Sequence, residues 1–171
     1  SAASSATITV SAPKQAQPAN IEGILAAGAA WWPLAMAREL DDAILMLRTN
    51  ELEIGTWLLK TRGDIDSVLA ADAALAANAD HWFVRATVGM LRRTLARLDV
   101  SSRTLFAIID PGSCFAGTLF ELALAADRSF MLALAEGESA APRIALSEAN
   151  FGAYPMVNRL TRILNLFCEE P

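Results

Sequence analysis

Short apolar runs that suit β-strands alternate along this chain with longer segments of helical spacing. The strand-like runs are "ATITVSAP" (6–13), "EIGTWLLK" (53–60), "TLFAIID" (104–110) and "SFMLAL" (129–134). The segments expected to be helical are 34–48, 67–78, 81–98 (with Asp80 as a cap), 118–127 and 156–170. This alternation predicts the α/β class with a mainly parallel sheet, because parallel strands need a long crossover connection.

Two other stretches fit neither pattern. "EGESAAP" (136–142) reads as a surface loop, and "RIALSEANFGAYP" (143–155) as a short strand followed by an irregular loop. The longest uncharged, mostly apolar run is 23–37, which is shorter than the ~20 residues of a membrane span. We therefore expect this run to be buried, with no membrane partner.

Length and composition restrict the class of protein further. The 171 residues suit one domain, and 54% hydrophobic against 19% charged residues predicts a globular chain. A net charge of −5 argues against a nucleic-acid partner. One histidine, and two cysteines outside any metal-type spacing, exclude a His-rich metal site and predict no metal. Free thiols and the lack of a signal-peptide pattern favour the cytoplasm.

A single carboxylate stands out in "IIDPGSCFAGTLFELALAADR" (108–128). Glu121 is the one charged residue between Asp110 and Asp127. The loop before it would leave a buried strand and enter a helix, where ligands bind in open α/β sheets and free N–H groups favour negative charge. This suggests an oxyanion site beside a carboxylate. The alternative is a capping box from Thr118 to Glu121, in which Glu121 only serves the helix end.

A second carboxylate, Glu148, lies in the mostly apolar stretch "ALSEANFGAYP". Two carboxylates in one pocket can acquire different pKa values and so share acid and base roles. The alternative is an ordinary surface glutamate at the end of a strand.

Three long strings carry a resemblance to a known family: "LFAIIDPGSCFAGTLFELALAADRSFML", "ARELDDAILMLRTNELEIGTWLLKTRGD" and "SEANFGAYP". Together they resemble the crotonase (enoyl-CoA hydratase/isomerase) superfamily over roughly residues 6–160. The resemblance implies one domain over 1–171 with a crotonase-like ββα superhelix, truncated before the superfamily's usual C-terminal helices. It also implies an acyl-CoA substrate, with coenzyme A as part of that substrate and no separate cofactor, and a homo-oligomer.

The resemblance assigns roles to individual residues. Glu121 and Glu148 fall on the two catalytic glutamates, with Ser147 in place of the family's proline. The residues expected to bind the thioester oxygen or the substrate are Leu69, Gly117, Thr118 and Cys114. Backbone N–H groups near Leu69 and at Thr118, or at neighbouring Gly117, would be the oxyanion donors. Cys114 lies in the same loop and reads as a small buried apolar side chain rather than a nucleophile.

The sequence resembles one branch of the superfamily more closely still. The enzymes of that branch are lyases that open the oxidised ring of benzoyl-CoA (the 2,3-epoxide or dihydrodiol). That reaction releases a carbon as formate in aerobic benzoate breakdown. Two alternatives stay open: an enoyl-CoA hydratase or isomerase for another acyl-CoA, and a non-catalytic module that binds acyl-CoA or assembles subunits. An enzyme needs Glu121 and Glu148 to face one water-sized gap, whereas a module could leave Glu148 in solvent.

Overall fold

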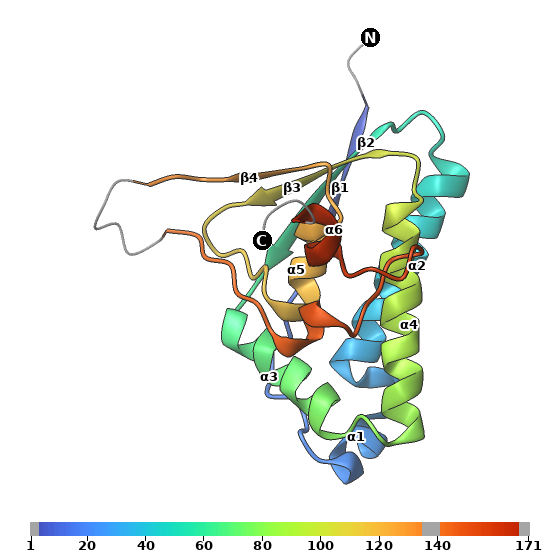
Figure 1. Ribbon diagram of the computed structural model, residues 1–171, viewed down its shortest axis with the longest axis vertical. Coiled ribbons are helices and arrows are strands. Elements are labelled where there is room, and N and C mark those ends of the chain that lie inside the picture. Colours follow the sequence, from blue (N-terminus) through green and yellow to red (C-terminus); the bar gives the residue numbers. More distant parts are fainter. Residues whose placement is uncertain (1–3, 135–140, 168–171) are drawn as a thin grey trace.

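The computed structural model of this chain describes residues 4–134 and 141–167. Figure 1 shows a sheet with helices packed around it. Most of the loop expected at 136–142, the end of the helix expected at 156–170, and Cys168 lie outside the described residues.

Four parallel strands form the sheet in the order β1-β2-β3-β4. They are β1 (Ser5–Ser11), β2 (Thr56–Arg62), β3 (Thr104–Ile109) and β4 (Arg128–Met131). Burial alternates along β1 to β3, so that Ile8, Leu59 and Ala107 face the core. The predicted α/β class with a parallel sheet is therefore confirmed.

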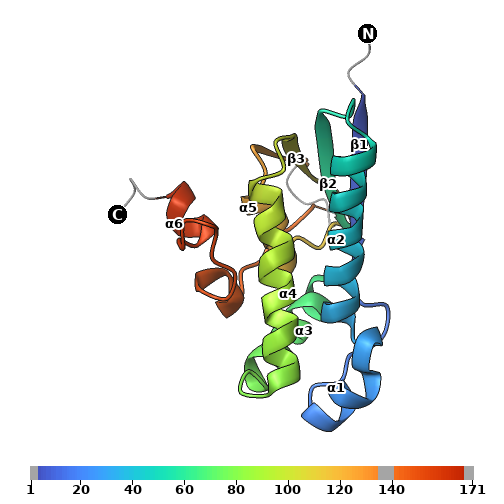
Figure 2. The ribbon, with the colours of Figure 1, turned by 90° about the vertical axis from the view of Figure 1, so that its right-hand side faces the viewer.

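The helices connect and cover these strands. They are α1 (Ile21–Ala27), α2 (Trp32–Asn50), α3 (Ile65–Ala77), α4 (Trp82–Asp99), α5 (Gly117–Leu124) and α6 (Arg162–Leu166), with short 3₁₀ turns η1 (Gly28–Ala30) and η2 (Glu148–Phe151). Figure 2 shows α2 and α4 side by side, and their contacts agree. Leu91, Leu95 and Leu98 recur at helical spacing on the buried face of α4. No helix of the described residues has the length and apolar character to cross a membrane.

Three expectations about elements need correction. His81, not Asp80, caps α4, because its Nδ1 atom accepts a hydrogen bond from the amide of Phe83 at 3.2 Å. The run 23–37 is only partly buried: Ile24 and Trp31 are inaccessible, whereas Leu25 is 44% exposed. The run reaches the surface because it folds as two short helical turns and the start of α2, so that only one side of each meets the core.

The helix expected at 156–170 is the third correction. Within the described residues it is reduced to the single turn of α6. Before it the chain makes a tight turn, in which the amide of Met156 donates to the carbonyl of Leu160 and Arg159 has a φ of 71°. By contrast, the stretch 143–155 combines a strand-like bridge from Ala145 to Ala116 with the irregular turn η2, as expected.

Candidate functional site

The loop from β3 into α5 brings the predicted site residues to one region. Helix α5 begins at Gly117, and its cap residue, Ala116, offers no side-chain hydrogen bond. Thr118 is therefore the second residue of the helix, and its hydroxyl donates to Asp72 instead of capping. The predicted capping box from Thr118 to Glu121 is wrong, because the helix starts before the residue that should cap it.

Glu121 belongs to a buried network of charged side chains. It is 1% exposed. Its carboxylate accepts a hydrogen bond from Asn150 at 2.7 Å and forms an ion pair with Arg162 at 2.8 Å. Arg162 also bonds to Asp99 at 2.8 Å. Burial raises the pKa of Glu121, although Asn150 and Arg162 each favour the charged form. The charge of this carboxylate is therefore balanced by Arg162, which is far from it in the sequence, and not by a role as a local helix cap.

Glu148 stands apart from this network. It opens the 3₁₀ turn η2, which the Ser147 side chain caps, and its own side chain is exposed. The described hydrogen bonds of Glu121 involve Asn150 and Arg162, not Glu148. The structure therefore does not join the two predicted catalytic carboxylates through a shared partner.

The amides expected to bind an oxyanion all have partners. Leu69 is the fifth residue of α3, past the first turn whose amides lack helix partners. The amide of Thr118 donates to Asp72 Oδ2 at 2.8 Å, and that of Gly117 donates to the carbonyl of Ala145 at 3.0 Å. The expectation of two free amides aimed at one spot is therefore not met, and the role of these residues in binding a thioester stays a prediction.

Cys114 lies deep in the same loop. It is inaccessible, and its amide donates to the Thr61 hydroxyl at 2.9 Å. Burial raises the pKa of its thiol, which disfavours the reactive thiolate. These surroundings agree with an apolar packing role.

Asp72 on α3 is a site residue that sequence reasoning missed. It is 6% exposed, and its carboxylate accepts hydrogen bonds from the amide and hydroxyl of Thr118 and from the Ser147 hydroxyl at 2.7 Å. Burial raises its pKa, although these hydrogen bonds favour the charged form. A lone acid in the apolar segment 67–78 is the same signal that singled out Glu121, so the sequence contained a clue to it.

A cavity of about 370 Å³ lies against Asp72. Most of its lining is apolar and much of it small, and the polar exceptions are Asp72, Ser147, Glu148 and Tyr154. Leu69 and Glu148, two of the predicted site residues, both contribute to its wall, whereas Glu121, Thr118 and Gly117 do not. The cavity can hold an apolar group and present carboxylate and hydroxyl oxygens to it.

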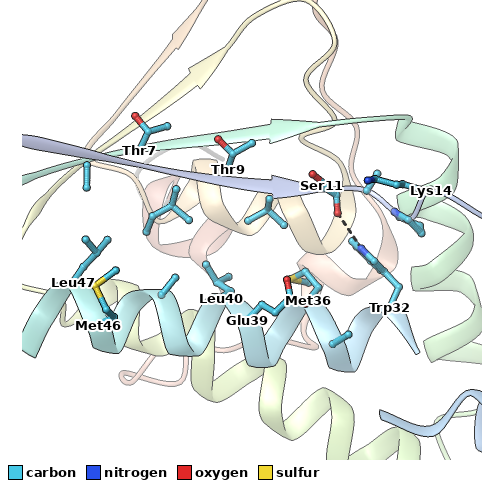
Figure 3. Close-up of a pocket in the computed structure, with 17 residues that line it drawn as sticks. Thr7, Thr9, Ser11, Lys14, Trp32, Met36, Glu39, Leu40, Met46 and Leu47 are labelled. Carbon is cyan, nitrogen blue, oxygen red and sulfur yellow. Dashed lines mark hydrogen bonds between the residues drawn. The ribbon is translucent and has the colours of Figure 1, made fainter. Parts of the chain in front are cut away.

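A larger hollow, of about 620 Å³, lies between β1 and α2 (Figure 3). In this view Thr7 and Thr9 of the edge strand point away from α2, whereas Leu40 points from α2 toward the strand, and Trp32 Nε1 donates to the carbonyl of Ser11 at 3.0 Å. It contains none of the predicted site residues. The cavity beside Asp72 is therefore the better candidate site.

Comparison with known proteins gives one informative relative. The benzoyl-CoA-dihydrodiol lyase of Aromatoleum evansii is 59% identical to this chain over 164 residues, which is 96% of the chain. The chain spans 29% of that protein's length. No family model matches the chain.

Proposed function

We propose that this chain is part of an acyl-CoA lyase with a crotonase-like fold that opens the oxidised ring of benzoyl-CoA and releases formate. The observation that carries the proposal is the 59% identity to a benzoyl-CoA-dihydrodiol lyase over 164 residues. Identity at this level over nearly the whole chain supports a shared substrate class. Because the chain covers 29% of that relative, the activity of the whole protein belongs to the proposal.

The cavity beside Asp72 is the proposed site for the acyl group. Its volume of about 370 Å³ falls in the range of about 300–1,000 Å³ that is typical of small-molecule sites. Leu69, Leu75 and Val88 offer apolar contact to a six-membered ring, and small residues such as Ala76 leave room for it. Coenzyme A would enter as part of the substrate.

Within this proposal, Glu148 would exchange a proton with a bound ligand, because it lines the cavity and is exposed, whereas Asp72, the other carboxylate of the lining, already accepts hydrogen bonds from Thr118 and Ser147. Glu121 would act only if its ion pair with Arg162 opened. The amide of Thr118 would bind the thioester oxygen only if Asp72 released it.

A substitution that fills the cavity tests the proposed site. We expect Ala76→Phe to abolish binding of benzoyl-CoA and any formate release from 2,3-epoxybenzoyl-CoA or the dihydrodiol thioester. Ala77→Phe, on the next residue of α3 and outside the cavity lining, is the matched control and should retain both. Failure of the wild-type chain to bind any acyl-CoA would contradict the proposal.

A non-catalytic acyl-CoA-binding module is the second candidate. It is favoured by the engagement of Glu121 with Arg162 and of the Thr118 amide with Asp72. Binding of benzoyl-CoA without turnover is the outcome that would select it, whereas hydration of crotonyl-CoA in preference to ring opening would select an enoyl-CoA hydratase.

A further inference from the structure

Residues 156–167, which include α6, bury very little of their surface. Arg162 is the one buried side chain of this segment, whereas Val157, Leu164 and Phe167 are each more than half exposed. Figure 2 shows α6 at the outer edge of the molecule, apart from α2. A segment with so few buried apolar side chains gains little stability from packing against the rest of the chain.

The hydrogen bonds of this segment are largely its own. The amide of Met156 donates to the carbonyl of Leu160 at 2.8 Å, and the amide of Asn165 donates to the carbonyl of Thr161 at 3.0 Å. Among the hydrogen bonds of the described residues, those that join the segment to the rest of the chain all come from the Arg162 side chain. One side chain therefore holds the segment in place.

Arg162 connects the segment to acids on two different helices. Its Nη1 atom donates to Glu121 of α5 at 2.8 Å and to the carbonyl of Tyr154 at 3.1 Å, and its Nη2 atom donates to Asp99 of α4 at 2.8 Å. Both ion pairs are buried, so three charged groups have lost contact with water. Release of Arg162 would restore their hydration, which offsets much of the loss of the two ion pairs.

Apolar packing between the segment and α5 is incomplete. Ile163 and Phe167 border a hollow of about 420 Å³ together with Phe120 and Leu124 of α5. Side chains that face a gap make fewer van der Waals contacts than those in a filled core. Tyr154, just before the segment, is by contrast 3% exposed. The chain is thus fixed by packing up to Tyr154 and by Arg162 after it.

We propose that residues 156–167 form a strap that opens as a unit when Arg162 is released, while the rest of the chain stays folded. The closed strap keeps the carboxylate of Glu121 buried and paired. The open strap exposes this carboxylate to water and leaves it free to exchange a proton. The strap therefore controls whether Glu121 is accessible. This inference goes beyond the proposed function, because it requires no acyl-CoA.

A permanently closed segment is the competing explanation, in which Glu121 is exposed only when the whole chain unfolds. Asp72 allows the two explanations to be distinguished. It is a buried acid, but its hydrogen-bond donors are Thr118 and Ser147, which lie outside the strap. Opening of the strap should therefore expose Glu121 and leave Asp72 protected.

The test measures how fast each carboxylate of the wild-type chain is labelled by a water-soluble carbodiimide and glycinamide, with peptide mass spectrometry as the readout. We expect the labelling rates of Glu121 and Asp99 to stay nearly constant in low urea, because opening of the strap exposes little surface. The labelling rate of Asp72 should rise steeply with urea, because it depends on global unfolding.

Substitutions on and off the strap add a second test. Arg162→Gln should speed the labelling of Glu121 at least about tenfold. Leu164→Ala, at an exposed position of the strap, is the matched control and should change this rate less than about twofold. Ile44→Val removes a methyl group from the buried face of α2, so it should speed the labelling of Asp72 several-fold and leave that of Glu121 unchanged.

Two results would overturn the strap. One is the same urea dependence for Glu121 and Asp72 in the wild-type chain, which decides the question even if Arg162→Gln fails to fold. The other is a folded Arg162→Gln variant in which Glu121 is labelled no faster. Neither result bears on acyl-CoA binding, which the Ala76→Phe variant tests separately.

Discussion

Glu121 and Asp72 are both single acids in apolar helical segments, yet the fold satisfies them in different ways. Glu121 pairs with Arg162, whereas Asp72 relies on neutral donors. The sequence predicts that such a residue needs a partner, because an isolated buried charge is costly. It does not predict which partner, since Arg162 comes from a segment that meets α5 only in the folded chain.

Removing the charge of Glu121 should therefore destabilise the folded chain. Glu121→Gln leaves the buried Arg162 with Asp99 as its remaining ion-pair partner. We therefore expect the free energy of unfolding to fall by about 3 kcal/mol. A cap alone would cost about 1 kcal/mol or less. Urea unfolding followed by circular dichroism measures the difference.

Glu148→Gln is the matched control for this prediction, because it makes the same chemical change at an exposed position. Its effect should stay within about 0.5 kcal/mol. If the two variants unfolded at the same urea concentration, the ion pair of Glu121 with Arg162 would contribute nothing measurable, and our account of this network would be wrong.

Among the elements, the start of α5 has the tightest steric constraint. Gly117 has a φ of 44°, and a Cβ there would collide with Oδ2 of Asp72. We expect Gly117→Ala to lower the free energy of unfolding by more than about 2 kcal/mol, because the strained backbone and the collision with a buried carboxylate both oppose it. Thermal or urea unfolding measures the loss.

Substitutions at two other glycines separate the cost of backbone strain from the cost of the collision with Asp72. Gly112 has a φ of 81° but open space around it, so Gly112→Ala should show the cost of backbone strain alone, about 1 kcal/mol. Gly89 lies inside α4 with nothing near it, and Gly89→Ala should raise stability by about 0.5–1 kcal/mol. A Gly117→Ala variant no worse than Gly112→Ala would show that the close approach of Asp72 is not constraining.

Elements that depend on local pattern were predictable, and those that depend on distant contacts were not. The strands β1 and β3 follow from alternating or continuous apolar residues, and the structure places them within about two residues of expectation. Helix α6 is shorter than the periodicity of 156–170 indicates, because the chain turns at Arg159 before Arg162 reaches Glu121. The cavity was likewise invisible in sequence, since α3, α4 and the residues around η2 form it together.

At the scale of the whole molecule, exposed apolar side chains concentrate near one end of the sequence. The run 23–37 contributes little to this exposed surface, since Leu25 is its one large apolar side chain that is exposed. Instead, Phe130, Met131, Ile144, Leu146 and Phe167 are each about half exposed. Ile144, Leu146 and Phe167 also border an apolar hollow of about 420 Å³ against α5 and α6. Apolar surface gathered in this way is typical of an interaction site.

We therefore expect this chain to self-associate, and Ile144→Lys to weaken the association. Ile144 is 46% exposed beside the hollow, so a lysine there fits the isolated chain but places an unpaired charge in any contact that covers it. Leu52→Lys makes the same change at a side chain that is 69% exposed in the turn between α2 and β2, and should leave association unaltered. Sedimentation velocity over a range of concentrations distinguishes the cases. A wild-type chain that stays monomeric at the highest concentration, or equal effects of the two lysines, would show that this surface does not drive assembly.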